Sequence, residues 1–132
     1  MKNYLIEVEG IDKCGKDLIE KYIYTLSNNR YIVHVRGLLS SMVYSEKFNR
    51  EYNYEIVYKP IILYLNVNEE DRLVRCKLTK EPKIDADLDR SLFEKYLNQL
   101  DQEGFIIYRY NTSEMTPYQI AKDVINKLES LN

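Results

Sequence analysis

Residues 4–26 read YLIEVEGIDKCGKDLIEKYIYTL. The first five, residues 4–8, form a short and mostly apolar run that predicts a buried strand. A turn over residues 10–16 follows, and after it apolar side chains recur at helical spacing. These helical positions are Leu18, Ile19, Tyr22, Ile23 and Leu26. The stretch therefore predicts a strand, a glycine-bounded turn and a helix in direct succession.

The turn matches the phosphate-binding pattern G-x-x-x-x-G-K. Gly10 and Gly15 allow backbone conformations closed to other residues, so that amide groups can turn toward a phosphate. The helix that follows directs its unpaired N–H groups and its dipole at the same point, where Lys16 adds a full charge. An ordinary turn with two glycines is the alternative, but it does not explain a lysine at the helix entrance. We therefore expect a nucleotide's phosphates to bind Gly10, Ile11, Asp12, Lys13, Cys14, Gly15, Lys16 and Asp17.

Asp17 stands where this pattern has the Ser or Thr that holds Mg²⁺. Carboxylate oxygen is a good magnesium ligand, and an acidic residue suits the first turn of a helix. Aspartate is also longer than serine and negatively charged, so it could instead repel the phosphates. Asp17 is the predicted metal ligand, with repulsion as the open alternative.

The composition limits the classes of protein to which the chain can belong. The chain has 132 residues, of which 45% are hydrophobic and 30% charged, which suits one folded domain over residues 1–132. A net charge of −2 does not favour direct nucleic-acid binding, and no run approaches a membrane span or a signal peptide. The two cysteines form no disulfide framework, which fits a reducing cytoplasm. Abundant Tyr, Lys, Asn and Ile suggest an AT-rich coding sequence from a low-GC bacterium or its phage, and hence a host cytoplasm if the protein is viral.

The rest of the chain alternates between strand and helix patterns. Strands are predicted at residues 30–35, 60–67 and 105–110, and helices at 38–50, 68–78 and 89–102 and from Thr116–Pro117 onward. Residues 51–59 are polar and rich in tyrosine, and they fit either a loop or a helix extension. This alternation predicts an α/β fold with a parallel sheet of about four strands and helices on both faces. Ligands of such sheets bind beyond the carboxyl ends of the strands, where the turn after the first strand also lies.

Several cations follow these elements. Arg36 comes directly after the second strand and could hold a phosphate bidentately, or be a solvated surface residue. Arg72 and Arg75 share a helix face and lead, with Lys77 and Lys80, into a charged segment. Such a cluster suits phosphoryl transfer, because negative charge on the moving group must be offset. A solvated charged helix is the alternative.

Four segments resemble thymidylate kinases. Residues 8–16, VEGIDKCGK, resemble that family's phosphate loop, which carries Glu-Gly-x-Asp. Residues 36–44, RGLLSSMVY, are similar to its Asp-Arg-Tyr-x-x-Ser-x-x-Ala-Tyr segment. Arg75, Lys80, Glu81 and Asp85 look like the lid region, and Asn111-Thr112-Ser113 resembles the segment against the ATP base. The resemblance implies a three-layer P-loop NTPase fold.

The resemblance also implies roles for individual residues. Lys16, Lys13, Arg36 and Arg75 would be catalytic, and the loop and Asn111 would bind ATP with Mg²⁺. The acceptor nucleotide would bind Asp12, Arg36, Ser40 and Tyr44. Val35 departs from the family, which has Asp there, and a strand and helices that the family carries before the Asp-Arg strand are missing. Residues 30–36 could alternatively correspond to that earlier strand, but Ser40 and Tyr44 favour the Asp-Arg alignment.

The leading hypothesis is a shortened, viral or phage, nucleoside monophosphate kinase that transfers the γ-phosphoryl group of Mg-ATP to dTMP or a similar deoxynucleotide. The main alternative is a degenerate P-loop protein that binds a nucleotide or a protein partner without catalysis, which Asp17, Val35 and the missing segment favour. A structural P-loop protein that binds no nucleotide is a third possibility.

Thymidylate kinases are dimers, and the resemblance therefore implies a homodimer. The residues supply a second motive, because a wide apolar arc on the helix after Arg36 and the tyrosines that follow it suggest an exposed interface. That surface comprises Leu39, Met42, Val43, Phe48, Tyr52, Tyr54 and Tyr58. A helix that is core on one side and solvated on the other is the alternative.

Overall fold

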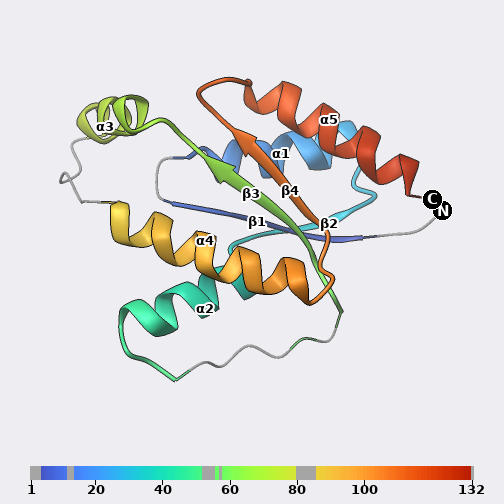
Figure 1. Cartoon of the computed structure of the whole chain (residues 1–132). Coiled ribbons are helices and arrows are strands. Elements are labelled where there is room, and N and C mark those ends of the chain that lie inside the picture. Colours follow the sequence, from blue (N-terminus) through green and yellow to red (C-terminus); the bar gives the residue numbers. More distant parts are fainter. Residues whose placement is uncertain (1–3, 12–13, 52–55, 57, 80–85, 132) are drawn as a thin grey trace.

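The computed structural model describes residues 4–11, 14–51, 56, 58–79 and 86–131. Its elements alternate between strand and helix along most of the chain (Figure 1). They are β1 (Leu5–Gly10), α1 (Lys16–Leu26), β2 (Ile32–Val35), α2 (Leu38–Lys47), β3 (Ile61–Asn66), α3 (Glu69–Leu78), α4 (Asp87–Gln102), β4 (Ile107–Asn111) and α5 (Pro117–Ser130). All the predicted strands and helices are present, with ends that move by up to three residues.

The four strands form one parallel sheet in the order β2-β1-β3-β4. Gly10 pairs with Leu65, and Asn66 pairs with Asn111, so β1, β3 and β4 end close together. β2 ends beside Val8 of β1. The loop after β1, Arg36 after β2 and the turn after β4 therefore leave the sheet at the same edge, as the α/β pattern predicts.

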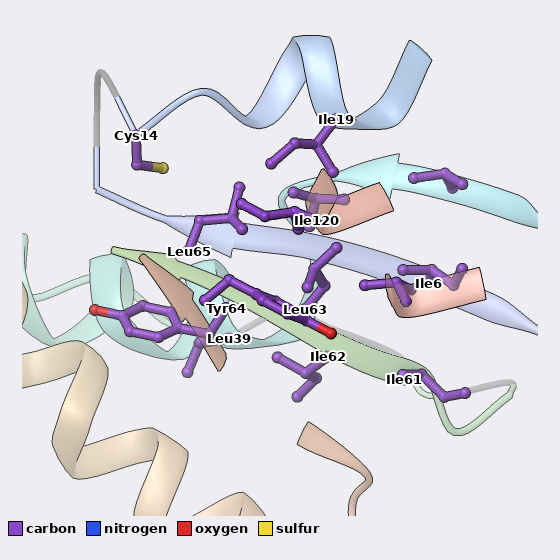
Figure 2. Close-up of a cluster of buried hydrophobic side chains, with 14 of the residues drawn as sticks. Ile6, Cys14, Ile19, Leu39, Ile61, Ile62, Leu63, Tyr64, Leu65 and Ile120 are labelled. Carbon is purple, nitrogen blue, oxygen red and sulfur yellow. The ribbon is translucent and has the colours of Figure 1, made fainter. Parts of the chain in front are cut away.

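Helices cover both faces of the sheet. α1 and α5 pack together on one face, and α2 and α4 pack together on the other (Figure 1). β3 runs between them and is buried on both sides from Ile61 to Leu65, which explains its continuous apolar sequence. Figure 2 shows Ile19 and Ile120 on one side of β3 and Leu39 on the other. α3 lies apart, at the carboxyl end of the sheet (Figure 1).

Local signals explain most element boundaries. α5 begins with a capping box, in which Thr116 and Gln119 exchange side-chain-to-backbone hydrogen bonds and Pro117 takes the first helical position. α2 ends at Lys47, three residues before its predicted end, because Asn49 adopts a left-handed conformation with φ 51°. Residues 52–55 and 57, part of the segment predicted as loop or helix extension, lie outside the described residues.

The apolar arc on α2 is covered by the chain itself. Leu39 and Val43 are fully buried, and Met42 packs against the core from a partly buried position. α4 lies against α2 and covers these side chains, so the expectation that they form an exposed surface is wrong. Phe48 and Tyr58 are exposed, whereas Tyr52 and Tyr54 lie outside the described residues. The physical motive for a homodimer is correspondingly reduced.

The outer side of β2 is partly occupied by a side chain of α1. Even-numbered positions of the strand bond to β1, through Ile32 N to Tyr4 O and Arg36 N to Val8 O. Val33 therefore directs its N–H and C=O groups outward. The Tyr24 hydroxyl accepts from the Val33 N–H at 3.0 Å and donates to the Val33 carbonyl at 3.0 Å. Both outward groups of this residue are thereby satisfied.

None of the helices within the described residues is long and apolar enough to cross a lipid bilayer. This holds for α4, which spans 16 residues and carries charged side chains along its length. Its buried positions are confined to one side, at Leu92, Phe93, Leu97 and Leu100. α4 is therefore a helix that packs on the sheet through a single apolar face.

Candidate functional site

The loop between β1 and α1 has the backbone geometry that its glycines predict. Gly10 has φ 147° and Gly15 has φ 94°, both in the range that side chains disfavour. A Cβ atom at Gly10 would lie 2.3 Å from the Leu65 carbonyl oxygen and 2.8 Å from Cys14 Sγ. The absence of a side chain there lets the loop pass directly over the end of β3. Asp12 and Lys13, predicted to contact the acceptor and the phosphates, lie outside the described residues.

The Lys16 side chain lies within this loop. Its ammonium donates to the carbonyl oxygens of Gly10 at 3.0 Å and Ile11 at 2.9 Å, and it lies 3.5 Å from Cys14 Sγ. Lys16 is buried, although it is the first residue of α1. Its charge is therefore concentrated at the mouth of the helix, where N–H groups without helical partners also point. This combination has the chemistry that anion-binding sites use.

Cys14 is a packing residue of the loop. Its side chain is fully buried, and burial raises the pKa of the thiol above its usual value, against the opposing charges of Lys16 and Arg36. A buried neutral thiol is unreactive, which favours the view that the residue is simply small enough to fit.

Arg36 adopts a left-handed conformation, with φ 69°, directly after β2. This conformation costs a non-glycine residue on the order of 1–2 kcal/mol, and it often marks functional positions. Its guanidinium Nη1 lies 3.3 Å from the Tyr44 hydroxyl, and the group lies 5.6 Å from the centre of the Tyr44 ring. Arg36 and Tyr44, both predicted to bind the acceptor, are thus brought together.

Ser40, predicted to bind the acceptor, is buried and bonded to Glu9. The Ser40 hydroxyl donates to Glu9 Oε1, and the Ser40 N–H donates to Glu9 Oε2 at 2.9 Å. Glu9 is completely buried, and burial raises its pKa to about 6 despite these hydrogen bonds. The nearby charge of Glu7 raises the pKa further. Sequence reasoning included Glu9 only as part of the Glu-Gly-x-Asp resemblance and did not single out Glu7.

Glu9 gives the protein a predictable pH dependence of stability. Its pKa is higher in the folded state, so the folded state binds the proton more tightly, and this stabilisation is lost as the pH rises through about 6. The shift from 4.5 to about 6 corresponds to roughly 2 kcal/mol. We expect urea unfolding from pH 4 to 7.5 to show that loss in the wild type and not in Glu9→Gln. A pH-independent difference between the two proteins would contradict the prediction.

Arg75 lies on the other side of the loop. Its Nη1 atom donates to Thr112 Oγ1 at 3.3 Å, which joins α3 to the turn after β4. A surface pocket of about 380 Å³ opens here, and its lining joins the phosphate-loop glycine to α3 and α5. The lining residues are Gly15, Leu18, Arg75, Thr79, Thr112 and Pro117. An apolar pocket edged by an arginine and two hydroxyls, next to an anion site, fits a nucleotide base.

Arg72 does not join Arg75 at this pocket. It is buried, and its guanidinium binds the Glu69 carboxylate through Nε at 3.0 Å and Nη2 at 2.6 Å. Arg90 of α4 binds the same carboxylate and donates to the Val67 carbonyl oxygen at 3.0 Å. The two arginines hold the pKa of Glu69 down at about 2. Arg72 is therefore paired within α3, and Arg90 joins α4 to the same carboxylate, which corrects the prediction of a shared cationic face. Lys80 lies outside the described residues.

Asn111, predicted to contact ATP, has a mainly structural position. Its amide Nδ2 donates to Asn68 Oδ1 at 2.9 Å, and its Oδ1 accepts from the Ser113 N–H at 2.8 Å. The next residue, Thr112, lines the pocket instead. The pocket lining also includes Leu18, Thr79 and Pro117, which the sequence analysis did not single out as site residues.

Asp17 is exposed in the first turn of α1, beside Lys16. Within the part of the chain that the structure describes, no group of three or more His, Cys, Asp and Glu side chains could hold a metal by itself. Mg²⁺ in nucleotide sites takes one or two carboxylates and completes its shell with phosphate oxygens and water. A single exposed carboxylate next to the phosphate loop therefore fits this ion when a nucleotide is bound.

No protein-family model matches the chain, and no curated protein matches it. Among solved structures it is similar to the YorR protein of Bacillus subtilis, crystallised in complex with phosphorylated GDP. The two share 21% sequence identity and superpose with a TM-score of 0.70, over 95% of each chain. This likeness confirms the predicted three-layer α/β fold with a small parallel sheet.

Proposed function

We propose that the protein transfers the γ-phosphoryl group of Mg-ATP to a deoxynucleoside monophosphate, dTMP or a similar acceptor. The observation that supports this most is the arrangement of three cations around one glycine-bounded loop. Lys16 lies inside the loop, Arg36 follows β2 beside Val8 of β1 at the same edge of the sheet, and Arg75 shares a pocket with Gly15. Phosphoryl transfer depends on such positioning and neutralisation of charge.

The arrangement suggests which residues would bind ATP and which would bind the acceptor. The pocket beside Arg75 and Thr112 would take the base of ATP, with the triphosphate on the loop and Lys16. Arg36, on the other side of the loop, would hold the acceptor's phosphate beside Tyr44, with Asp12 and Lys13 contributing from the loop. YorR carries phosphorylated GDP, and a protein of the same fold that carries a nucleotide supports nucleotide binding here. The proposal includes a single domain over residues 1–132, acting in cytoplasmic nucleotide biosynthesis, in the host if the protein is viral.

A coupled assay of ADP formation with a panel of nucleoside monophosphates, next to calorimetry with ATP, tests the proposal. Turnover of one or more deoxynucleoside monophosphates is the expected result. ATP binding without turnover of any acceptor would favour the degenerate P-loop protein, an alternative that Asp17 and Val35 keep open. Absence of both would leave a P-loop protein with a purely structural role.

Asp17 offers a test of the metal requirement. If the carboxylate is a ligand of Mg²⁺, Asp17→Asn removes a charge that the ion needs and should weaken binding of Mg-ATP, by roughly tenfold, while leaving metal-free ATP unaffected or slightly tighter. Paired titrations with MgCl₂ and with EDTA measure both affinities. Tighter binding in both series would mean that Asp17 repels phosphate, and would support the degenerate alternative.

Self-association remains part of the proposal through the resemblance to thymidylate kinases. Because Leu39 and Val43 are covered by α4, a dimer would have to use Phe48, Tyr58 and neighbouring residues instead. Light scattering at micromolar concentration should give about twice the 15.8 kDa chain mass. A mass of one chain across a dilution series would show that these exposed side chains form no interface.

A further inference from the structure

The first turn of α2 is held by two carboxylates from β1. Glu7 Oε1 accepts from the Leu38 N–H at 2.9 Å, and Glu9 Oε2 accepts from the N–H groups of Gly37 at 3.2 Å and Ser40 at 2.9 Å. The Ser40 hydroxyl donates to the other oxygen of Glu9. Helices usually satisfy these amide groups with a local Ser, Thr, Asp or Asn, whereas the cap residue here is Gly37. The helix start depends on residues about thirty positions earlier in the chain.

The burial of these two carboxyl groups costs free energy, so their position needs an explanation. Both carboxyl groups are almost completely buried, and burial of carboxylates is unfavourable unless hydrogen bonds offset it. A serine at position 37 would be a usual local cap for this helix. Serine does not fit, however, because a Cβ atom at Gly37 would lie 2.2 Å from Glu7 Cδ. Glu7 thus fills the space that a side chain at Gly37 would need.

The same contacts fix the turn that contains Arg36. Its backbone N–H donates to the Val8 carbonyl oxygen at 2.8 Å, and its left-handed φ of 69° directs the chain straight into α2. A strained conformation of this kind persists only when surrounding bonds determine it. The hydrogen bonds from Gly37 and Leu38 to the two carboxylates are those bonds. Tyr44, on α2, holds the guanidinium at the other end.

We propose that Glu7 and Glu9 are positioning residues that set Arg36 for the acceptor's phosphate, a role that rests on the phosphoryl transfer proposed above. Their hydrogen bonds to the first turn of α2 also explain why an arginine is needed to bind a phosphate here. A helix N-terminus is normally a place where phosphate binds, but three amide groups of the first turn of α2 are already bonded to carboxylates. An acceptor phosphate on this side of the loop is therefore left to the arginine.

A purely structural role for the carboxylates makes a different prediction. It would lower stability and weaken ATP and acceptor binding together. Positioning of Arg36 predicts a selective effect on the acceptor, because ATP is held by the loop and the Arg75 pocket. The separation of these two affinities is thus the decisive measurement.

The test compares Glu9→Ala, Glu9→Gln and the control Glu129→Gln, which alters an exposed carboxylate on α5. Glutamine keeps the size of the side chain and one acceptor oxygen, so it should rescue most of the effect. We expect Glu9→Ala to raise the KM for the acceptor by at least about tenfold, with ATP affinity within twofold of wild type and the control unchanged. Ser40→Ala, which removes a single bond to Glu9, should give a smaller change in the same direction and serves if Glu9→Ala does not fold.

A second readout does not need a nucleotide acceptor. In the wild type, inorganic phosphate should shift the Arg36 Nε–Hε signal in NMR spectra, and the shift should be lost in Glu9→Ala and kept in Glu9→Gln. If no monophosphate is turned over but this dependence on Glu9 is present, the proposed kinase activity is wrong and the positioning role stands. Equal losses of ATP and acceptor affinity, an unchanged acceptor KM in a folded Glu9→Ala, or no response of Arg36 to phosphate would overturn the positioning role.

Discussion

Replacement of Lys16 by alanine is expected to weaken ATP binding by roughly 100-fold, because charge-assisted hydrogen bonds contribute about 1.5–3 kcal/mol each. The ammonium lies within 3.0 Å of the loop carbonyl oxygens of Gly10 and Ile11, at the mouth of α1. Only a short movement of a side chain that is already inside the loop would bring it to a bound phosphate. No backbone amide group can replace its full positive charge.

Lys21→Ala is the matched control for this variant. It removes the same side chain from an exposed position one and a half turns further along α1, and it should leave ATP affinity unchanged. Calorimetry with ATP measures all three proteins, and thermal melts show whether each is folded. Equal ATP affinity in the wild type and a folded Lys16→Ala would refute phosphate binding by the loop, and with it the proposed function.

Replacement of Gly10 by alanine is expected to destabilise the fold by about 4 kcal/mol, from overpacking and backbone strain together. The new Cβ atom would lie 2.3 Å from the Leu65 carbonyl oxygen, which is backbone of the central strand β3 and has no room to withdraw. A φ of 147° adds conformational strain for any residue with a side chain. A loss of this size is close to the whole free energy of unfolding of the least stable natural domains, which is about 5 kcal/mol.

Gly15→Ala separates strain from overlap. Gly15 also has a positive φ, of 94°, but its nearest neighbour for a Cβ atom is Thr112 Cγ2 at 3.9 Å, an ordinary contact. We expect it to cost about 1–2 kcal/mol, which is the conformational term alone. Urea denaturation of both variants measures the difference. Similar losses in the two proteins would mean that the loop and β3 move apart easily.

The parts of the structure that were predictable depend on neighbours in sequence. The apolar run of β3, the glycines at 10 and 15, and the capping box at Thr116 each carry their signal within a few residues. The same is true of the parallel order of strands and helices. The phosphate-loop geometry could therefore be placed before the fold was known, and so could the position of Arg36 at the edge where β1 and β2 end.

The parts that were not predictable depend on contacts between distant residues. Glu9 meets Ser40 across thirty-one positions, and a glutamate in an apolar strand gives no sign of which helix it will cap. Arg72 and Arg75 have the residue type and spacing of a cationic pair. Arg72, however, binds the Glu69 carboxylate, which Arg90 also binds, and so does not join Arg75. The cover that α4 provides for Leu39 and Val43 likewise follows from packing alone. Sequence patterns therefore failed to predict the role of a side chain wherever that role depends on a contact with a residue distant in sequence.

The hydroxyl of Tyr24 also has a bearing on how the protein behaves at high concentration. β2 ends the sheet on one side, and an open strand edge is a template on which other chains can add strands and begin to aggregate. On this four-residue strand, the outward N–H and C=O groups of Val33 are already bonded to the tyrosine. A second molecule would have to displace that hydroxyl before its own strand could pair. One aromatic side chain of a neighbouring helix thus helps to keep the β2 edge of this small sheet from recruiting other chains.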